Sequence, residues 1–78
     1  MPKNPVEWDV DHIVAWANLT FNSKEGRTEI TSFLKDQKVN GEDLFDLNDA
    51  MLEKMGLSLL LLRKRLLKAI ATLKETSA

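Results

Sequence analysis

The stretch from Leu34 to Leu73 constrains the fold of this chain more than any other feature. It contains three helix-sized apolar patterns arranged around Gly41 and Gly56, and it separates its charges into one wholly acidic segment and one later, wholly basic segment. Apolar residues that recur every three or four positions mark the buried face of a helix. The stretch therefore predicts a helical binding module rather than an enzyme.

The length and composition of the chain predict one small domain that depends on its apolar core. The 78 residues include no cysteine, so no disulfide or thiolate-bound metal can stabilise the fold. A domain of this size buries only about 60% of its unfolded surface. Most of the 44% apolar content is therefore needed for the core, and little is left to line a deep pocket.

The charge and the apolar runs bear on partners and location. The net charge of −1 gives no overall attraction to nucleic acid or anionic membranes. No apolar run approaches the roughly 20 residues of a membrane span, and the N-terminal residues lack the apolar segment of a signal peptide. Together with the absence of cysteine, this favours an intracellular, cytoplasmic location.

Hydrophobic spacing predicts five helices. The first three are expected near residues 10–18, 27–37 and 42–47; the fourth begins after Asn48 and stops at Gly56, and a long last helix begins after Ser58 and runs to about Lys74. Asp9, Asn48 and Ser58 are the expected N-caps, because their side chains can accept the free N–H groups of a first turn. Asn40-Gly41 is a possible hairpin turn, but no alternating strand flanks it, which favours a connection into a helix.

The predicted fold is an all-α, compact five-helix bundle. Residues 1–7 are expected to form a flexible N-terminal segment, extended until Val6 and Trp8 anchor it, followed by a domain over residues 8–74 and a flexible tail over 75–78. Trp8, Trp16 and Phe21 are expected to pack against the fold. The apolar positions that keep helical spacing form the expected core, namely Val10, Ile13, Val14, Ile30, Leu34, Val39, Leu44, Leu47, Leu52, Met55, Leu57, Leu66, Ile70 and Leu73.

Several segments, in this order, resemble one known family. Residues 8–16 have a tryptophan at each end with a capped turn between them, residues 39–47 read as apolar-x-Gly-x-x-Leu-Phe-x-Leu, and Met55-Gly56-Leu57 precedes a basic and apolar run over residues 63–70. This arrangement resembles the sterile alpha motif (SAM) domain over residues 8–73. The weakest likeness lies between Ala17 and Thr31. The resemblance implies five helices, no catalysis and no cofactor.

The resemblance also implies association through two surfaces, one across the middle helices and one at the start of the last helix. The first would consist of acidic residues, which here are Glu42, Asp43, Asp46, Asp49 and Glu53. The second would consist of Leu61, Leu62, Arg63, Lys64, Arg65 and Lys68. Opposite charges steer encounter and set register. The alternative interpretation is that both segments are ordinary solvated helix faces.

The run Leu59 to Leu62 departs from the family, which often has small or polar residues at the last two of these positions. Helical spacing places Leu61 on the same face as Lys64, Arg65 and Lys68, so we expect Leu61 and Leu62 to be exposed interface anchors. Leu59 and Leu60 are expected to extend the core.

The favoured function is a protein–protein interaction module in a signalling or scaffold protein. Its partner would be another SAM domain, either a second copy in a head-to-tail oligomer or a different protein. The alternatives are RNA hairpin binding through Arg63, Lys64, Arg65 and Lys68, and membrane binding by insertion of Leu61 and Leu62.

The sequence offers no chemistry for catalysis. His12 is the only histidine, so it has no partner for a transition-metal site or a nucleophilic pair. The acidic residues lack the spacing of a calcium loop. We therefore expect no enzyme activity, no metal and no cofactor.

Overall fold

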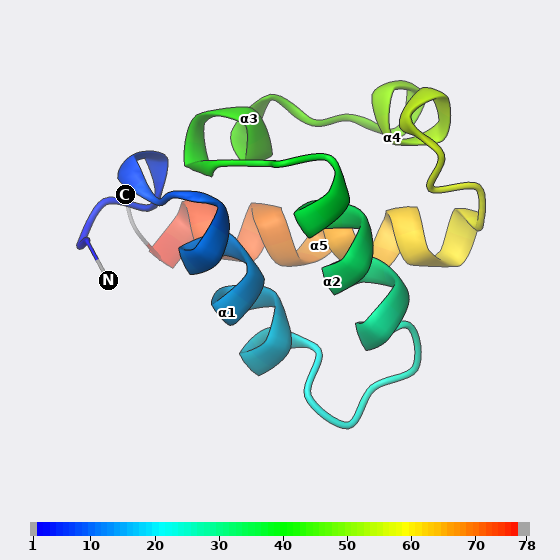
Figure 1. Cartoon of the computed structure of the whole chain (residues 1–78), viewed down its shortest axis with the longest axis horizontal. Coiled ribbons are helices and arrows are strands. Elements are labelled where there is room, and N and C mark those ends of the chain that lie inside the picture. The colour runs from blue at the N-terminus through cyan, green and yellow to red at the C-terminus, as the bar shows by residue number, and fades with distance from the viewer. Residues whose placement is uncertain (1, 77–78) are drawn as a thin grey trace.

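The computed structural model describes residues 2–76 and is all-helical over that range. Figure 1 shows the longest helix running the length of the molecule, with α1 and α2 crossing in front of it and α3 and α4 lying along one side. The elements in chain order are a 3-10 turn η1 (Pro5–Glu7) and five α-helices, α1 (Val10–Thr20), α2 (Arg27–Asp36), α3 (Gly41–Asp46), α4 (Asp49–Met55) and α5 (Leu60–Thr76). The predicted five-helix fold with a long last helix is confirmed.

Side-chain caps begin three of the helices. Asp9 accepts the N–H of His12 at 2.9 Å, and Asn48 accepts the N–H of Met51 at 2.9 Å, as predicted. Asn40 accepts the N–H of Asp43 at 2.9 Å. Each bond satisfies a backbone donor that has no partner inside the helix. Asn40-Gly41 therefore starts a helix and not a hairpin.

The start of α5 differs from the prediction. Its first residue is Leu60, and the N–H of Arg63 donates to the carbonyl oxygen of Leu59 at 3.1 Å. Leu59 therefore occupies the position before the helix that was assigned to Ser58. At the end of α4, Gly56 stops the helix as predicted, and it does so in a left-handed cap with φ of 113°.

The N-terminal segment packs against α3 instead of remaining extended as far as Val6. Pro5 is fully buried, Val6 is exposed, and the N–H of Gly41 donates to the carbonyl oxygen of Trp8 at 2.8 Å. A Cβ at Gly41 would collide with the carbonyl oxygen of Pro5, so only glycine permits this approach. The indole Nε1 of Trp8 also donates to the carbonyl oxygen of Pro2 at 2.8 Å.

The division into residues 1–7, 8–74 and 75–78 stays a prediction. Residues 75 and 76 belong to α5. Residues 1, 77 and 78 of the predicted terminal segments lie outside the described residues.

The core lies between α5 and the other helices. Nine of the predicted core residues are buried, namely Ile13, Ile30, Leu34, Val39, Leu44, Leu52, Leu57, Leu66 and Ile70. The other five predicted core residues, Val10, Val14, Leu47, Met55 and Leu73, are half-buried at its edge. Trp8, Trp16 and Phe21 are buried as expected, and Ala17 and Leu62 join the core without having been predicted to.

Candidate interaction surfaces

The predicted acidic residues are exposed on two of the middle helices. Glu42, Asp43 and Asp46 lie on α3, and Asp49 and Glu53 lie on α4. All five side chains are exposed, and no lysine or arginine occurs between residues 40 and 53. We call these five residues the acidic surface.

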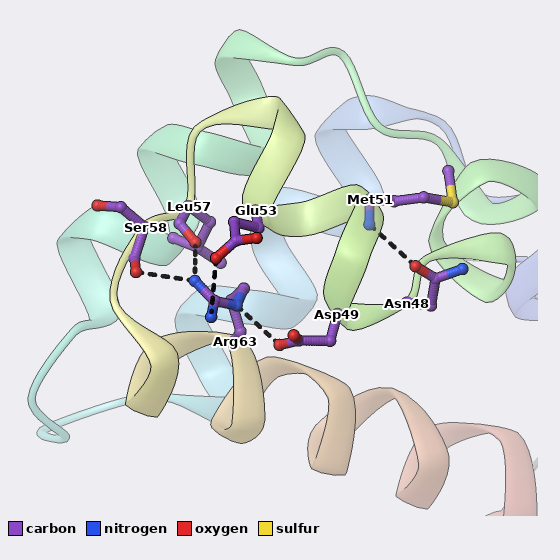
Figure 2. A network of polar contacts seen from close by, with 7 residues as sticks. All are labelled: Asn48, Asp49, Met51, Glu53, Leu57, Ser58 and Arg63. Atoms are coloured by element: carbon purple, nitrogen blue, oxygen red, sulfur yellow. Dashed lines mark hydrogen bonds and ion pairs between the residues drawn. The ribbon is translucent and has the colours of Figure 1, made fainter.

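Arg63, predicted to meet a partner, is instead a buried clamp between α4 and α5. Its Nη1 donates to the carbonyl oxygens of Leu57 at 2.9 Å and Ser58 at 2.8 Å, and its Nε donates to Asp49 Oδ1 at 2.7 Å. Its Nη2 lies 3.6 Å from Glu53 Oε2. Figure 2 shows the guanidinium enclosed by these four acceptors. A planar group with five donors suits such a site because it can serve several acceptors at once.

The contacts of Arg63 contradict its predicted role in partner binding, and they change the roles of two predicted acidic residues. Arg63 is only 5% exposed, so it is not available to a second molecule. Asp49 and Glu53 direct part of their charge to Arg63, although their side chains remain 53% and 67% exposed. One of the four predicted cations thus pairs with two of the five predicted acids within a single molecule.

The leucine run also differs from the prediction. Leu59, Leu60 and Leu61 are 62%, 51% and 64% exposed, whereas Leu62 is 7% exposed. Leu62 is therefore not an interface anchor, and Leu59 and Leu60 do not extend the core. We call Leu59, Leu60 and Leu61 the leucine tip.

Gly26 explains why Leu62 can be buried. This residue precedes α2 with φ of 88°, and a Cβ on it would collide with Leu62 Cδ2. The missing side chain therefore creates the space that Leu62 fills. Leu59 immediately precedes α5 and is exposed.

A hollow of about 650 Å³ lies between the leucine tip and the start of α2. The leucines form its apolar side, while Glu25, Glu29 and Arg65 supply its charged lining. Arg65 is held in place because its Nη1 donates to the carbonyl oxygen of Glu25 at 3.1 Å. Lys64, Arg65 and Lys68 are exposed, and Arg65 lines the hollow beside the tip.

Helical spacing contained a signal that could have identified the two misassigned residues. Leu62 precedes the buried Leu66 by four positions, and Arg63 precedes the buried Ile70 by seven. Both spacings place residues on one face of a helix. Leu61, by contrast, precedes Arg65 by four positions and Lys68 by seven, which correctly placed it on the outer face.

The remaining candidate residues have structural roles or none. His12 completes the N-terminal cap of α1, since its Nδ1 accepts the N–H of Asp9 at 3.3 Å. Within residues 2–76, no group of three or more His, Asp or Glu side chains is arranged to hold a metal ion. Over the same residues, every helix is too short or too polar to cross a bilayer.

The chain belongs to the SAM domain family, whose model matches residues 30–74. The match includes most of α2, the whole of α3 and α4, and α5 to Lys74, while α1 lies outside it. No curated protein and no solved structure matches the chain. SAM domains are protein-interaction modules and typically bind other SAM domains or other proteins.

Proposed function

We propose that this domain associates with another SAM domain head to tail, through its leucine tip and the adjacent cations on one side and its acidic surface on the other. The observation that carries the proposal is the exposure of three consecutive leucines next to Lys64 and Arg65. Isolated exposed leucines are common. A group of them beside a charged rim is typical of a protein-binding site.

The two surfaces have complementary roles in the proposal. Burial of the leucine tip would provide most of the attraction, at about 25 cal/mol for each Å² removed from water. Pairing of Lys64, Arg65 and Lys68 with Glu42, Asp43 and Asp46 would guide approach and select the register. Added salt should therefore weaken association only modestly. Because the two surfaces differ, identical copies would form open chains unless the geometry closes a ring.

The RNA alternative has less support. Arg63, one of its four predicted contacts, is buried and bonded within the domain. The leucines at the start of α5 offer no hydrogen bonds to a phosphate backbone. Membrane insertion likewise loses Leu62, which is buried.

Complementation between two variants tests the proposal by sedimentation velocity. Leu61→Glu damages the tip, and Asp46→Lys reverses a charge on the acidic surface. Each variant alone should be monomeric, yet an equal mixture should form a dimer, because each molecule keeps one intact surface. Leu62→Glu is unsuitable, since a buried charge would unfold the domain.

Matched controls show whether a loss of association comes from the position of a substitution or from its chemical type. Leu19 is 75% exposed on α1 and does not line the hollow beside the leucine tip, so Leu19→Glu should leave association unchanged. Asp11→Lys makes the same charge change at an exposed position on α1 that does not line the hollow beside the leucine tip, and it should also have no effect. If the mixture stays monomeric while the unmutated chain associates, the two surfaces do not meet. If the unmutated chain is monomeric at high concentration, the self-association version is wrong and only a different SAM partner remains.

A further inference from the structure

A second hollow, of about 490 Å³, shares Arg65 with the hollow beside the leucine tip. The end of α1, the following loop and the outer face of α5 form its walls. Lys24, Arg65 and Lys68 line it together, and no acidic residue lines it. Three cations thus converge in a molecule whose net charge is −1. We call these residues and the space between them the basic hollow.

The cations of the basic hollow are not neutralised within the domain. No ion pair of Lys24, Arg65 or Lys68 occurs among residues 2–76. Glu25 and Glu29 share the hollow beside the leucine tip with Arg65, but neither of them lines the basic hollow. Like charges brought together without a partner repel one another. The arrangement is therefore suited to an anion from outside the chain.

The shape of the basic hollow limits the kind of anion. Trp16 and Phe21 form part of its floor, but they are only 9% and 3% exposed. Their rings pack edge to face, with centroids 6.4 Å apart. Side chains buried to this extent leave no open ring face for a base to stack on. Single-stranded RNA recognition depends on bases that stack on exposed aromatic faces, so this floor does not suit a nucleobase.

We propose that the basic hollow binds a compact polyphosphate, such as an inositol phosphate, either free or as the headgroup of a lipid. An arginine held in position by the carbonyl oxygen of Glu25 can present a fork of donors to one phosphate. Two lysines supply mobile charges for the others. The hollow has room for more than one phosphate group.

Binding there would also regulate association. Arg65 lines both hollows, and Lys68 belongs to the cations proposed to meet the acidic surface of a second molecule. A bound polyphosphate would neutralise these two side chains and compete with that surface. This regulatory part rests on the proposed function, whereas binding of the anion by the isolated domain does not.

Calorimetric titration of the unmutated chain with inositol hexakisphosphate tests the site. We expect saturable binding that Lys24→Gln/Lys68→Gln weakens at least tenfold. The control Lys35→Gln/Lys54→Gln removes the same charge from exposed positions on α2 and α4 and should change affinity less than twofold. Absence of saturable binding, or equal weakening by both pairs, would overturn the site.

Fluorescence gives a second, local readout. In a Trp8→Phe background the only remaining indole is Trp16, which lines the hollow. Its emission should change on titration with the same midpoint as the heat signal. Saturable heat with no change in Trp16 emission would show that the anion binds elsewhere and would overturn the proposal.

Vesicles distinguish the sources of the phosphate. Binding to vesicles that contain phosphatidylinositol bisphosphate is compared with binding to phosphatidylserine vesicles of equal charge. Stronger binding to the first kind that requires Lys24 and Lys68 would show recognition of the lipid headgroup. Binding of the soluble anion alone assigns the free polyphosphate. An RNA hairpin that binds more tightly than either would overturn the ligand class.

The complementation dimer tests the regulatory part. Saturating inositol hexakisphosphate should dissociate the mixture of Leu61→Glu and Asp46→Lys chains. If the dimer persists with the anion bound, competition is wrong although the site stands. If no dimer forms at all, the proposed function fails, and the titration of the monomer still decides the anion site.

Discussion

Two faces of the first turns of α5 differ although their residues are of the same kinds. On the inner face, Leu62 and Arg63 are buried, and the arginine is bonded to both neighbouring backbone and carboxylates. On the outer face, Leu61 and Arg65 are exposed beside two hollows. Leucine and arginine thus stabilise the domain on one face and remain available to partners on the other.

The difference shows that residue type alone does not identify a binding surface. A domain of this length has a free energy of unfolding of about 4 to 12 kcal/mol. Moving Leu62 outward would forfeit roughly 2 kcal/mol of that through lost burial, while Leu61 contributes little to it. Substitutions at the four positions can therefore separate folding from association.

The largest difference is expected between the two leucines. Leu62→Ala should lower the free energy of unfolding by about 2 to 4 kcal/mol, because it leaves a cavity against Gly26, whereas Leu61→Ala should change it by less than about 0.5 kcal/mol. Urea unfolding measures both values. Equal midpoints for the two variants would contradict the assignment of the inner and outer faces.

The two arginines should differ nearly as much. Arg63→Ala removes the donor to the carbonyl oxygens of Leu57 and Ser58 and should cost about 2 to 3 kcal/mol. Arg65→Ala loses a single exposed bond to the loop and should cost about 0.5 kcal/mol or less. Arg63→Lys is an informative control in the same urea titration, because one ammonium group cannot reach all four acceptors and should recover only part of the loss. Equal costs at Arg63 and Arg65 would show that the clamp does not stabilise the junction.

Gly26 supports the inner face from outside α5. Gly26→Ala combines left-handed strain with a collision against Leu62 and should cost about 2 to 3 kcal/mol. Gly56→Ala is the control, since Gly56 also has positive φ but no atom lies within 4 Å of its would-be Cβ; its cost should be about 1 to 2 kcal/mol. In a Leu62→Ala background the two costs should converge, because the collision is gone. A difference that persists there would assign the extra cost to something other than Leu62.

The smallest effects are expected at the carboxylates of the clamp. Solvent screens both groups, so Asp49→Asn should cost about 0.5 to 1 kcal/mol and Glu53→Gln less than about 0.5 kcal/mol. Thermal or urea unfolding at low and high salt can resolve the first change. A loss at Asp49 as large as that of Arg63→Ala would mean that the ion pair, rather than the carbonyl contacts, stabilises the junction.

The sequence by itself determined the helices and most of the core. Helical spacing and polar caps are local properties, so Asp9, Asn48 and Gly56 marked helix ends correctly, and positions such as Ile30 and Leu66 were recognised as buried. The match of the family model to residues 30–74 agrees with the motifs recognised in that part of the chain.

Only the tertiary structure decided how the inner and outer faces of α5 are used. The burial of Leu62 depends on a glycine 36 positions earlier in the chain, and the role of Arg63 depends on carbonyl groups that become available only where α4 turns into α5. The basic hollow likewise requires Lys24 of the first loop to meet Arg65 and Lys68. Helical spacing indicates which face of α5 Leu62 and Arg63 occupy, but it does not specify these contacts, because each contact depends on where other elements place their backbone.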